Sequence, residues 1–126
     1  MSDSTFVLDT NFILDYLKGT PAHARFIAES DNPALKISDI TRLELLSFPL
    51  LNDTEKNRIH DFLEHVEILS VSESIGNIAI TFRKETRRKL PDSIIAATAI
   101  FLEAPLVTSD KELLFTAFEG LSTIHP

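Results

Sequence analysis

Four acidic residues stand where a strand is expected to end or a helix to begin, and together they could bind a divalent metal ion. They are Asp9 in TFVLDTNFILDYL, Glu44 in ISDITRLELL, Asp92 in LPDSIIAATAI and Asp110 in LVTSDKELL. In a chain whose strands and helices alternate, ligand sites form beyond the carboxyl ends of the parallel strands. Residues far apart in the sequence can therefore meet there, and we expect these four carboxylates to converge.

Each of these acids also has a structural explanation. Asp9 and Asp110 are suitable helix N-caps, and Asp92 lies in a first helical turn, where a negative charge suits the helix dipole. Glu44 interrupts an apolar run, and Asp92 opens a nearly all-apolar helix. A buried carboxylate is unfavourable unless it is paired or coordinated. Carboxylates ~5 Å apart repel by roughly 3 kcal/mol at an effective dielectric of about 20, so such a cluster favours a shared cation.

The available ligand atoms indicate which cation this would be. The chain has no cysteine, and its four histidines include no pair at helical spacing. Oxygen ligands alone indicate Mg²⁺ or Mn²⁺ rather than zinc. One or two such ions would activate a water molecule and stabilise the leaving oxygen of an in-line phosphodiester displacement.

A basic segment, residues 83–89, stands out from an otherwise acidic chain. The net charge of −7 argues against unspecific coating of nucleic acid, which depends on neutralising phosphates. Within RKETRRK, however, five of seven residues are basic, namely Arg83, Lys84, Arg87, Arg88 and Lys89. These cations could complement the dipole at a helix end, or they could hold a polyanion beside the acidic pocket. Both interpretations can hold together.

Length and composition fit one globular domain over residues 1–126. A domain of 126 residues buries about two-thirds of its unfolded-chain surface. A hydrophobic content of 44% with three Gly and six Pro excludes the disordered and low-complexity classes. No apolar run approaches the ~20 residues of a membrane span, and the N-terminus MSDSTF lacks the regions of a signal peptide. We therefore expect a cytoplasmic protein.

An alternation of strands and helices is predicted to position the acids. Strands are predicted at residues 6–8, 34–37, 66–71, 106–108 and 121–124. Helices are predicted from cap residues, first-turn prolines and apolar periodicity, and they begin near Asp9, Pro21, Ser38, Asn52, Ser72, Pro91 and Asp110. The helix over residues 93–102 should be largely enclosed, since eight of these ten residues are apolar, and the last helix should reach about Phe118. This pattern predicts an α/β fold with a parallel sheet covered on both faces.

The four acidic strings resemble the motifs of a known family. FVLDTNFILDYL, ISDITRLELL, LPDSIIAATAI and LVTSDKELLF are similar to the four acidic motifs of PIN domains, particularly the VapC-type ribonuclease toxins, and they occur in the family's order. The resemblance implies that Asp9, Glu44, Asp92 and Asp110 are the catalytic, metal-binding acids. It implies that the neighbouring polar residues Thr10, Asn11 and Thr108 orient ligands or water. It also implies the strand order 3-2-1-4-5, a homodimer, and an antitoxin partner whose C-terminal segment covers the site.

The leading interpretation is a Mg²⁺-dependent endoribonuclease, the toxin of a type II toxin–antitoxin system, with Mn²⁺ able to substitute and RNA held by the basic segment. Asp15, also in the first motif, is interpreted as a solvated helix residue.

One alternative is a PIN-fold protein-binding module with little or no nuclease activity; a lost acid would favour it, and none is lost. Another is an aspartyl-phosphate enzyme. The string DTN at residues 9–11 in place of DxD argues against a haloacid-dehalogenase-like phosphatase, and a receiver module would need an adjacent acidic pair near the first strand.

Overall fold

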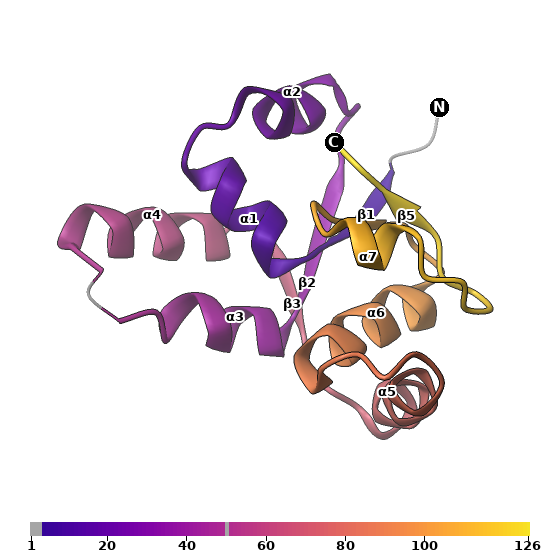
Figure 1. Ribbon diagram of the computed structural model, residues 1–126. Coiled ribbons are helices and arrows are strands. Elements are labelled where there is room, and N and C mark those ends of the chain that lie inside the picture. The colour runs from indigo at the N-terminus through magenta and orange to yellow at the C-terminus, as the bar shows by residue number, and fades with distance from the viewer. Residues whose placement is uncertain (1–3, 50) are drawn as a thin grey trace.

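A five-stranded parallel sheet forms the centre of the computed structural model, which describes residues 4–49 and 51–126 (Figure 1). The elements follow one another as β1 (Thr5–Leu8), α1 (Thr10–Leu17), α2 (Pro21–Glu29), β2 (Ala34–Ser38), α3 (Asp39–Leu46), α4 (Asp53–Leu63), β3 (Glu67–Leu69), α5 (Glu73–Thr86), α6 (Leu90–Leu102), β4 (Leu106–Val107), α7 (Lys111–Leu114) and β5 (Thr123–Ile124). The strands lie in the order β3-β2-β1-β4-β5, and every neighbouring pair is parallel. The α/β class and the 3-2-1-4-5 order are therefore confirmed.

Local cap chemistry fixes where several helices begin. The side chain of Ser38 accepts a hydrogen bond from the first turn of α3, and Ser72 does the same for α5. Asn52 and Glu55 form the reciprocal capping box of α4: each side chain accepts from the other residue's backbone N–H. Such caps satisfy amide groups that have no partner within the helix. These starts agree with the residues from which the helices were predicted.

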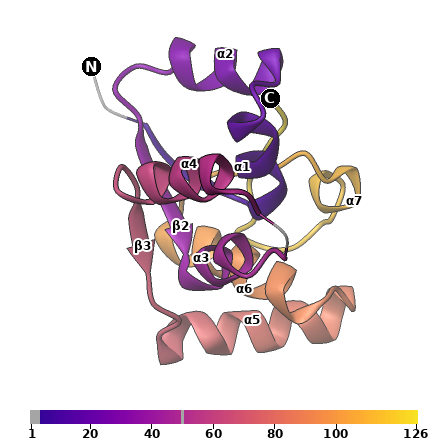
Figure 2. The same cartoon turned by 90° about the vertical axis from the view of Figure 1, so that its left-hand side faces the viewer.

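Helices cover both faces of the sheet (Figures 1 and 2). Phe6 and Leu8 of β1 belong to the core that α1, α2 and α4 close, whereas Val7 belongs to the core beneath α5 and α6. This alternation follows the two-residue period of a strand. All three side chains are buried, and each contributes roughly 1.5–3 kcal/mol when fully buried. Strand β1 is thus fixed from both sides, and it leads directly into Asp9.

Helix α6 is largely enclosed, as its apolar sequence predicts, although Leu90 and Phe101 are exposed. Its buried residues include Ile95, Ala96 and Thr98, and it packs along α5. The buried hydroxyl of Thr98 donates to the Ile94 carbonyl at 2.8 Å, so that this polar group is satisfied within the helix. No helix in the described ranges is long and apolar enough to cross a membrane.

The last two elements are shorter than predicted. Helix α7 ends at Leu114 instead of continuing to about Phe118, and Phe115 is 85% exposed. Phe118 lies beyond the helix and packs against Phe82 of α5, with ring centroids 4.9 Å apart. Gly120 then turns the chain into β5 with φ of 88°, a conformation that glycine adopts without strain. Strand β3 likewise covers only three residues of the predicted range 66–71.

Candidate functional site

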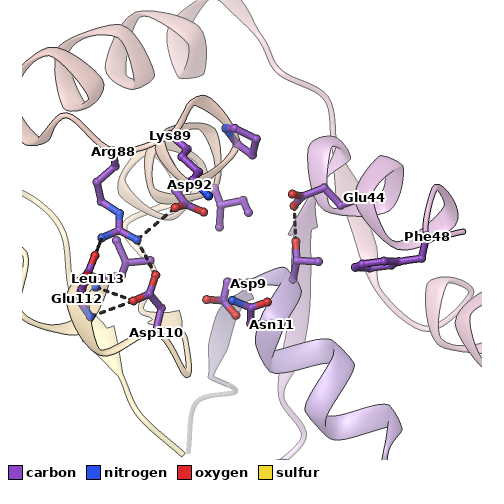
Figure 3. A pocket seen from close by; sticks show the side chains of 13 residues that line it. Asp9, Asn11, Glu44, Phe48, Arg88, Lys89, Asp92, Asp110, Glu112 and Leu113 are labelled. Carbon is purple, nitrogen blue, oxygen red and sulfur yellow. Dashed lines mark hydrogen bonds and ion pairs between the residues drawn. The ribbon is translucent and has the colours of Figure 1, made fainter.

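The four predicted acids line one pocket of about 350 Å³ (Figure 3). Thr10 and Asn11 also line it, and so do Arg88 and Lys89 from the basic segment. Asp9 directly follows β1, while Asp110 lies three residues beyond the end of β4, which is the neighbour of β1 in the sheet. The carboxyl ends of these parallel strands bring distant motifs to one edge. The expected convergence into one pocket is therefore observed.

Asp9 is the most restrained of the four acids. Its Oδ1 accepts a hydrogen bond of 2.7 Å from the Phe12 backbone N–H, which makes Asp9 the N-cap of α1. Its Oδ2 accepts a hydrogen bond from the Thr108 hydroxyl. The residue is only 6% exposed. Burial is the largest cause that raises the pKa of Asp9, the two hydrogen bonds lower it, and the nearby carboxylates Asp110 and Asp92 raise it; the net result is a pKa of about 6.

Thr108 lies behind the pocket and connects two of its acids. The residue is fully buried, and its hydroxyl donates to Asp9 while accepting from the Asp110 backbone N–H at 2.9 Å. Thr108 and Asp9 are 99 positions apart in the sequence. This hydroxyl fixes the position of one carboxylate and the backbone that carries another, which fits the supporting role that the resemblance implies.

Glu44 approaches the pocket from α3 on the side opposite Arg88 (Figure 3). Its Oε1 accepts a 2.6 Å hydrogen bond from the Thr10 hydroxyl, at the start of α1. Buried Thr41 lies 3.3 Å from the same hydroxyl. Thr41 was missed by the sequence argument, although it stands three residues before Glu44, on the same face of the helix. Thr10 thus holds Glu44 in place.

Arg88 lies inside the pocket, paired with acids. Its Nη2 donates to Asp92 Oδ2 at 3.2 Å and to Asp110 Oδ2 at 2.5 Å. Its Nη1 lies 3.5 Å from Glu112 Oε2, and its side chain is only 12% exposed. Glu112 was not predicted, although an acid two residues after Asp110, in the same helical turn, is a signal that could have indicated it. Figure 3 shows the guanidinium directed toward these three carboxylates.

The rest of the basic segment lies outside the acidic cluster. Arg83 and Lys84 are exposed in the last turn of α5, and Arg87 is exposed at its C-cap. Lys89 is exposed and lines the pocket, at the N-cap of α6. The basic segment is therefore divided into four exposed cations and one, Arg88, that is paired with acids in the pocket. Contact of these residues with RNA stays a prediction.

The donor atoms of the pocket fit a hard divalent cation, although the side chains are not gathered around one point. The ionisable lining groups besides Arg88 and Lys89 are all carboxylates, and oxygen ligands suit Mg²⁺ and Mn²⁺. Among residues 4–49 and 51–126, no three His, Cys, Asp or Glu side chains are grouped closely enough to hold an ion as they stand. Glu44 is held by its hydrogen bond to Thr10. The positive charge that is paired with Asp92 and Asp110 is the Arg88 guanidinium rather than a metal ion.

Comparison with known proteins finds similar sequences and similar folds. The PIN domain family model matches residues 6–119. Ribonuclease VapC19 of Mycobacterium tuberculosis is 33% identical over 111 residues, which cover 82% of this chain and 87% of that protein. A toxin–antitoxin complex from Klebsiella pneumoniae contains a similar chain, with a TM-score of 0.77, 27% identity and coverage of 93% of this chain and 95% of that one. VapBC-1 from nontypeable Haemophilus influenzae also has a TM-score of 0.77 and 27% identity, with coverage of 96% and 97%.

Proposed function

The chain belongs to the PIN domain family, and from this premise we propose that it is a metal-dependent endoribonuclease, the toxin of a type II toxin–antitoxin system. The observation that carries the proposal is the pocket that all four motif acids line, with buried Asp9 among them. The name of the similar ribonuclease VapC19 supports the reaction class. The similar toxin–antitoxin complexes support the biological role.

The metal ion would be held by the acids of the pocket, and we propose Mg²⁺, with Mn²⁺ as a substitute. Asp9, Asp92, Asp110 and Glu44 would supply the ligands. When bound, such an ion neutralises charge on the phosphoryl group and makes a water molecule a better nucleophile. The similar ribonuclease and the all-oxygen donor set support this assignment.

The surrounding residues would keep the acids in fixed positions. Thr108 and the Phe12 amide hold both oxygens of Asp9, so its carboxylate needs little rearrangement during the reaction. Thr10 holds Glu44 from α1. Asn11 is exposed and lines the same pocket, where its amide could orient water or an RNA phosphate. Groups that are already oriented lose little entropy on reaching the transition state.

Removal of the metal tests the proposed reaction directly. We expect purified protein to cleave a structured RNA in Mg²⁺, to lose this activity in chelator, and to regain it when Mg²⁺ or Mn²⁺ is added in excess. Gel analysis of end-labelled RNA would measure the cleavage and show that it is internal. Cleavage that continues unchanged in chelator would contradict metal dependence.

The exposed basic residues should bind the RNA backbone. We expect the double variant Lys84→Gln/Arg87→Gln to weaken RNA binding and to lower the slope of log affinity against log salt by about one per residue, because each phosphate contact releases counterions. Fluorescence anisotropy in chelator, over a salt series, measures both quantities. Lys56→Gln/Arg58→Gln on exposed positions of α4 is the charge-matched control. If the slope of log affinity against log salt were the same for the two double variants, the basic segment would not be part of the RNA interface.

A protein partner should cover the pocket. Leu43, Leu46 and Phe48 are exposed apolar residues on α3 or just beyond it, and Phe48 lines the pocket. An apolar surface beside an acidic pocket suits a partner segment that carries both apolar and basic side chains. We propose that this partner is a cognate antitoxin. We also propose that the chain forms a homodimer and acts on RNA in the cytoplasm. The similar solved complexes support the antitoxin.

A further inference from the structure

Arg88 differs from the other cations of the basic segment in burial and in partners. Its side chain is 12% exposed, and its Nε is buried without a hydrogen-bond partner among the described residues. Helix α5 ends at Thr86, and Arg87 adopts a left-handed conformation with φ of 61° before Arg88 enters the pocket. The charge of Arg88 is therefore removed from water and is compensated by the carboxylates that surround it.

We infer that Arg88 is a built-in counterion that competes with the divalent metal for Asp92 and Asp110. The inference rests on the proposed metal site and adds that Arg88 regulates how readily a metal ion occupies it. A single nitrogen, Nη2, donates to both carboxylates. A metal ion bound to these oxygens would lie close to the positively charged guanidinium, and the repulsion between the two cations favours release of Arg88. Arg88 thus stabilises the metal-free pocket and lowers its affinity for the ion.

The physical basis is the partial burial of the ion pairs, in which the side chain of Arg88 is 12% exposed, that of Asp110 27% and that of Asp92 36%. A charge pair that is partly removed from water is screened far less than a surface pair, so separating its members has a real energetic cost. If the state with Arg88 released has a population of about 10%, the apparent affinity for metal falls tenfold relative to a permanently open site. The divalent ion can still bind, since its double charge is attracted by all four carboxylates of the pocket.

Metal titration of Arg88 variants tests the competition. We expect Arg88→Gln and Arg88→Ala each to bind Mn²⁺ about tenfold more tightly than the wild type, measured by calorimetry or by the electron paramagnetic resonance of free Mn²⁺. Lys111→Gln removes the same charge next to Asp110. Lys111 is exposed and takes no part in the described ion pairs, so a change within about twofold is expected for this control. Thermal melts in chelator would establish that each variant is folded.

The possible outcomes separate this inference from the proposed function. Arg88 variants with unchanged or weaker Mn²⁺ affinity would overturn the competition, and so would an equal gain in Lys111→Gln. Wild-type protein that cleaves RNA while the affinities remain equal would overturn the competition alone. A tenfold gain in Mn²⁺ affinity without any RNA cleavage would support the competition and contradict the nuclease. Failure of every variant to bind Mn²⁺ would also overturn the inference, because removal of Arg88 would not have opened a site.

Discussion

Replacement of Asp92 by Asn should lower the rate of RNA cleavage by roughly 10³-fold, because it removes a charge that acts in the pocket while keeping the size of the side chain. The Asp92 side chain is 36% exposed, so the protein should remain folded. Asp92 lines the pocket from the first turn of α6. Single-turnover cleavage of one labelled RNA at saturating Mg²⁺ would measure the loss in the chemical step.

Asp15 supplies the matched control for Asp92→Asn. It is an acid of the first motif, but it lies outside the lining of the pocket and contacts His23 at 3.4 Å. We expect Asp15→Asn to cleave within about twofold of the wild-type rate, as most substitutions away from a site do. Equal cleavage by Asp92→Asn and wild type would instead indicate a contaminating nuclease and would remove the support for the proposed mechanism.

Replacement of Asp9 by Asn should stabilise the metal-free protein at neutral pH by up to about 3 kcal/mol. Burial and neighbouring carboxylates raise the pKa of Asp9 from 3.8 to about 6 in the folded state. Between these two values the folded protein binds more protons at Asp9 than the unfolded chain does. The free energy of unfolding therefore falls as pH rises through this window, and Asn, which cannot ionise, is free of this loss.

Chemical denaturation in chelator from pH 4 to pH 8 would measure this difference. The stability gap between Asp9→Asn and wild type should widen up to about pH 6 and then remain constant. Mg²⁺ should narrow the gap, since a ligand stabilises the form that binds it more tightly. Asp53→Asn, an exposed acid in the first turn of α4, is the control and should show no such widening. A constant gap at all pH values would contradict the raised pKa of Asp9.

Most of the fold could be predicted because its signals are local. Ser38, Ser72 and the Asn52–Glu55 pair mark helix starts by hydrogen bonds within a few residues of each other. The apolar run of β1 and the composition of α6 directly indicate burial. The positions of the four acids relative to these elements then follow from the topology of a parallel sheet.

The details of the pocket depend on contacts that no local pattern contains. Arg88 is paired with Asp110, which lies 22 positions away, and its entry into the pocket follows the left-handed turn at Arg87. Five basic residues in seven give no indication that one of them is buried. The same holds for Thr41, whose role depends on Thr10 being close in space. The roles of Arg88 and Thr41 therefore depend on residues that are close in space, which spacing and residue type in the sequence do not indicate.

The hydroxyl of Thr108 has a consequence for biosynthesis. Asp9 emerges from the ribosome first, but Thr108, which directly follows β4, and Asp110 emerge about a hundred residues later, as the 99-position separation of Asp9 and Thr108 requires. An unfinished nascent chain therefore cannot assemble the centre that would attack RNA. The assembly of this centre therefore depends on residues that are translated about a hundred positions apart.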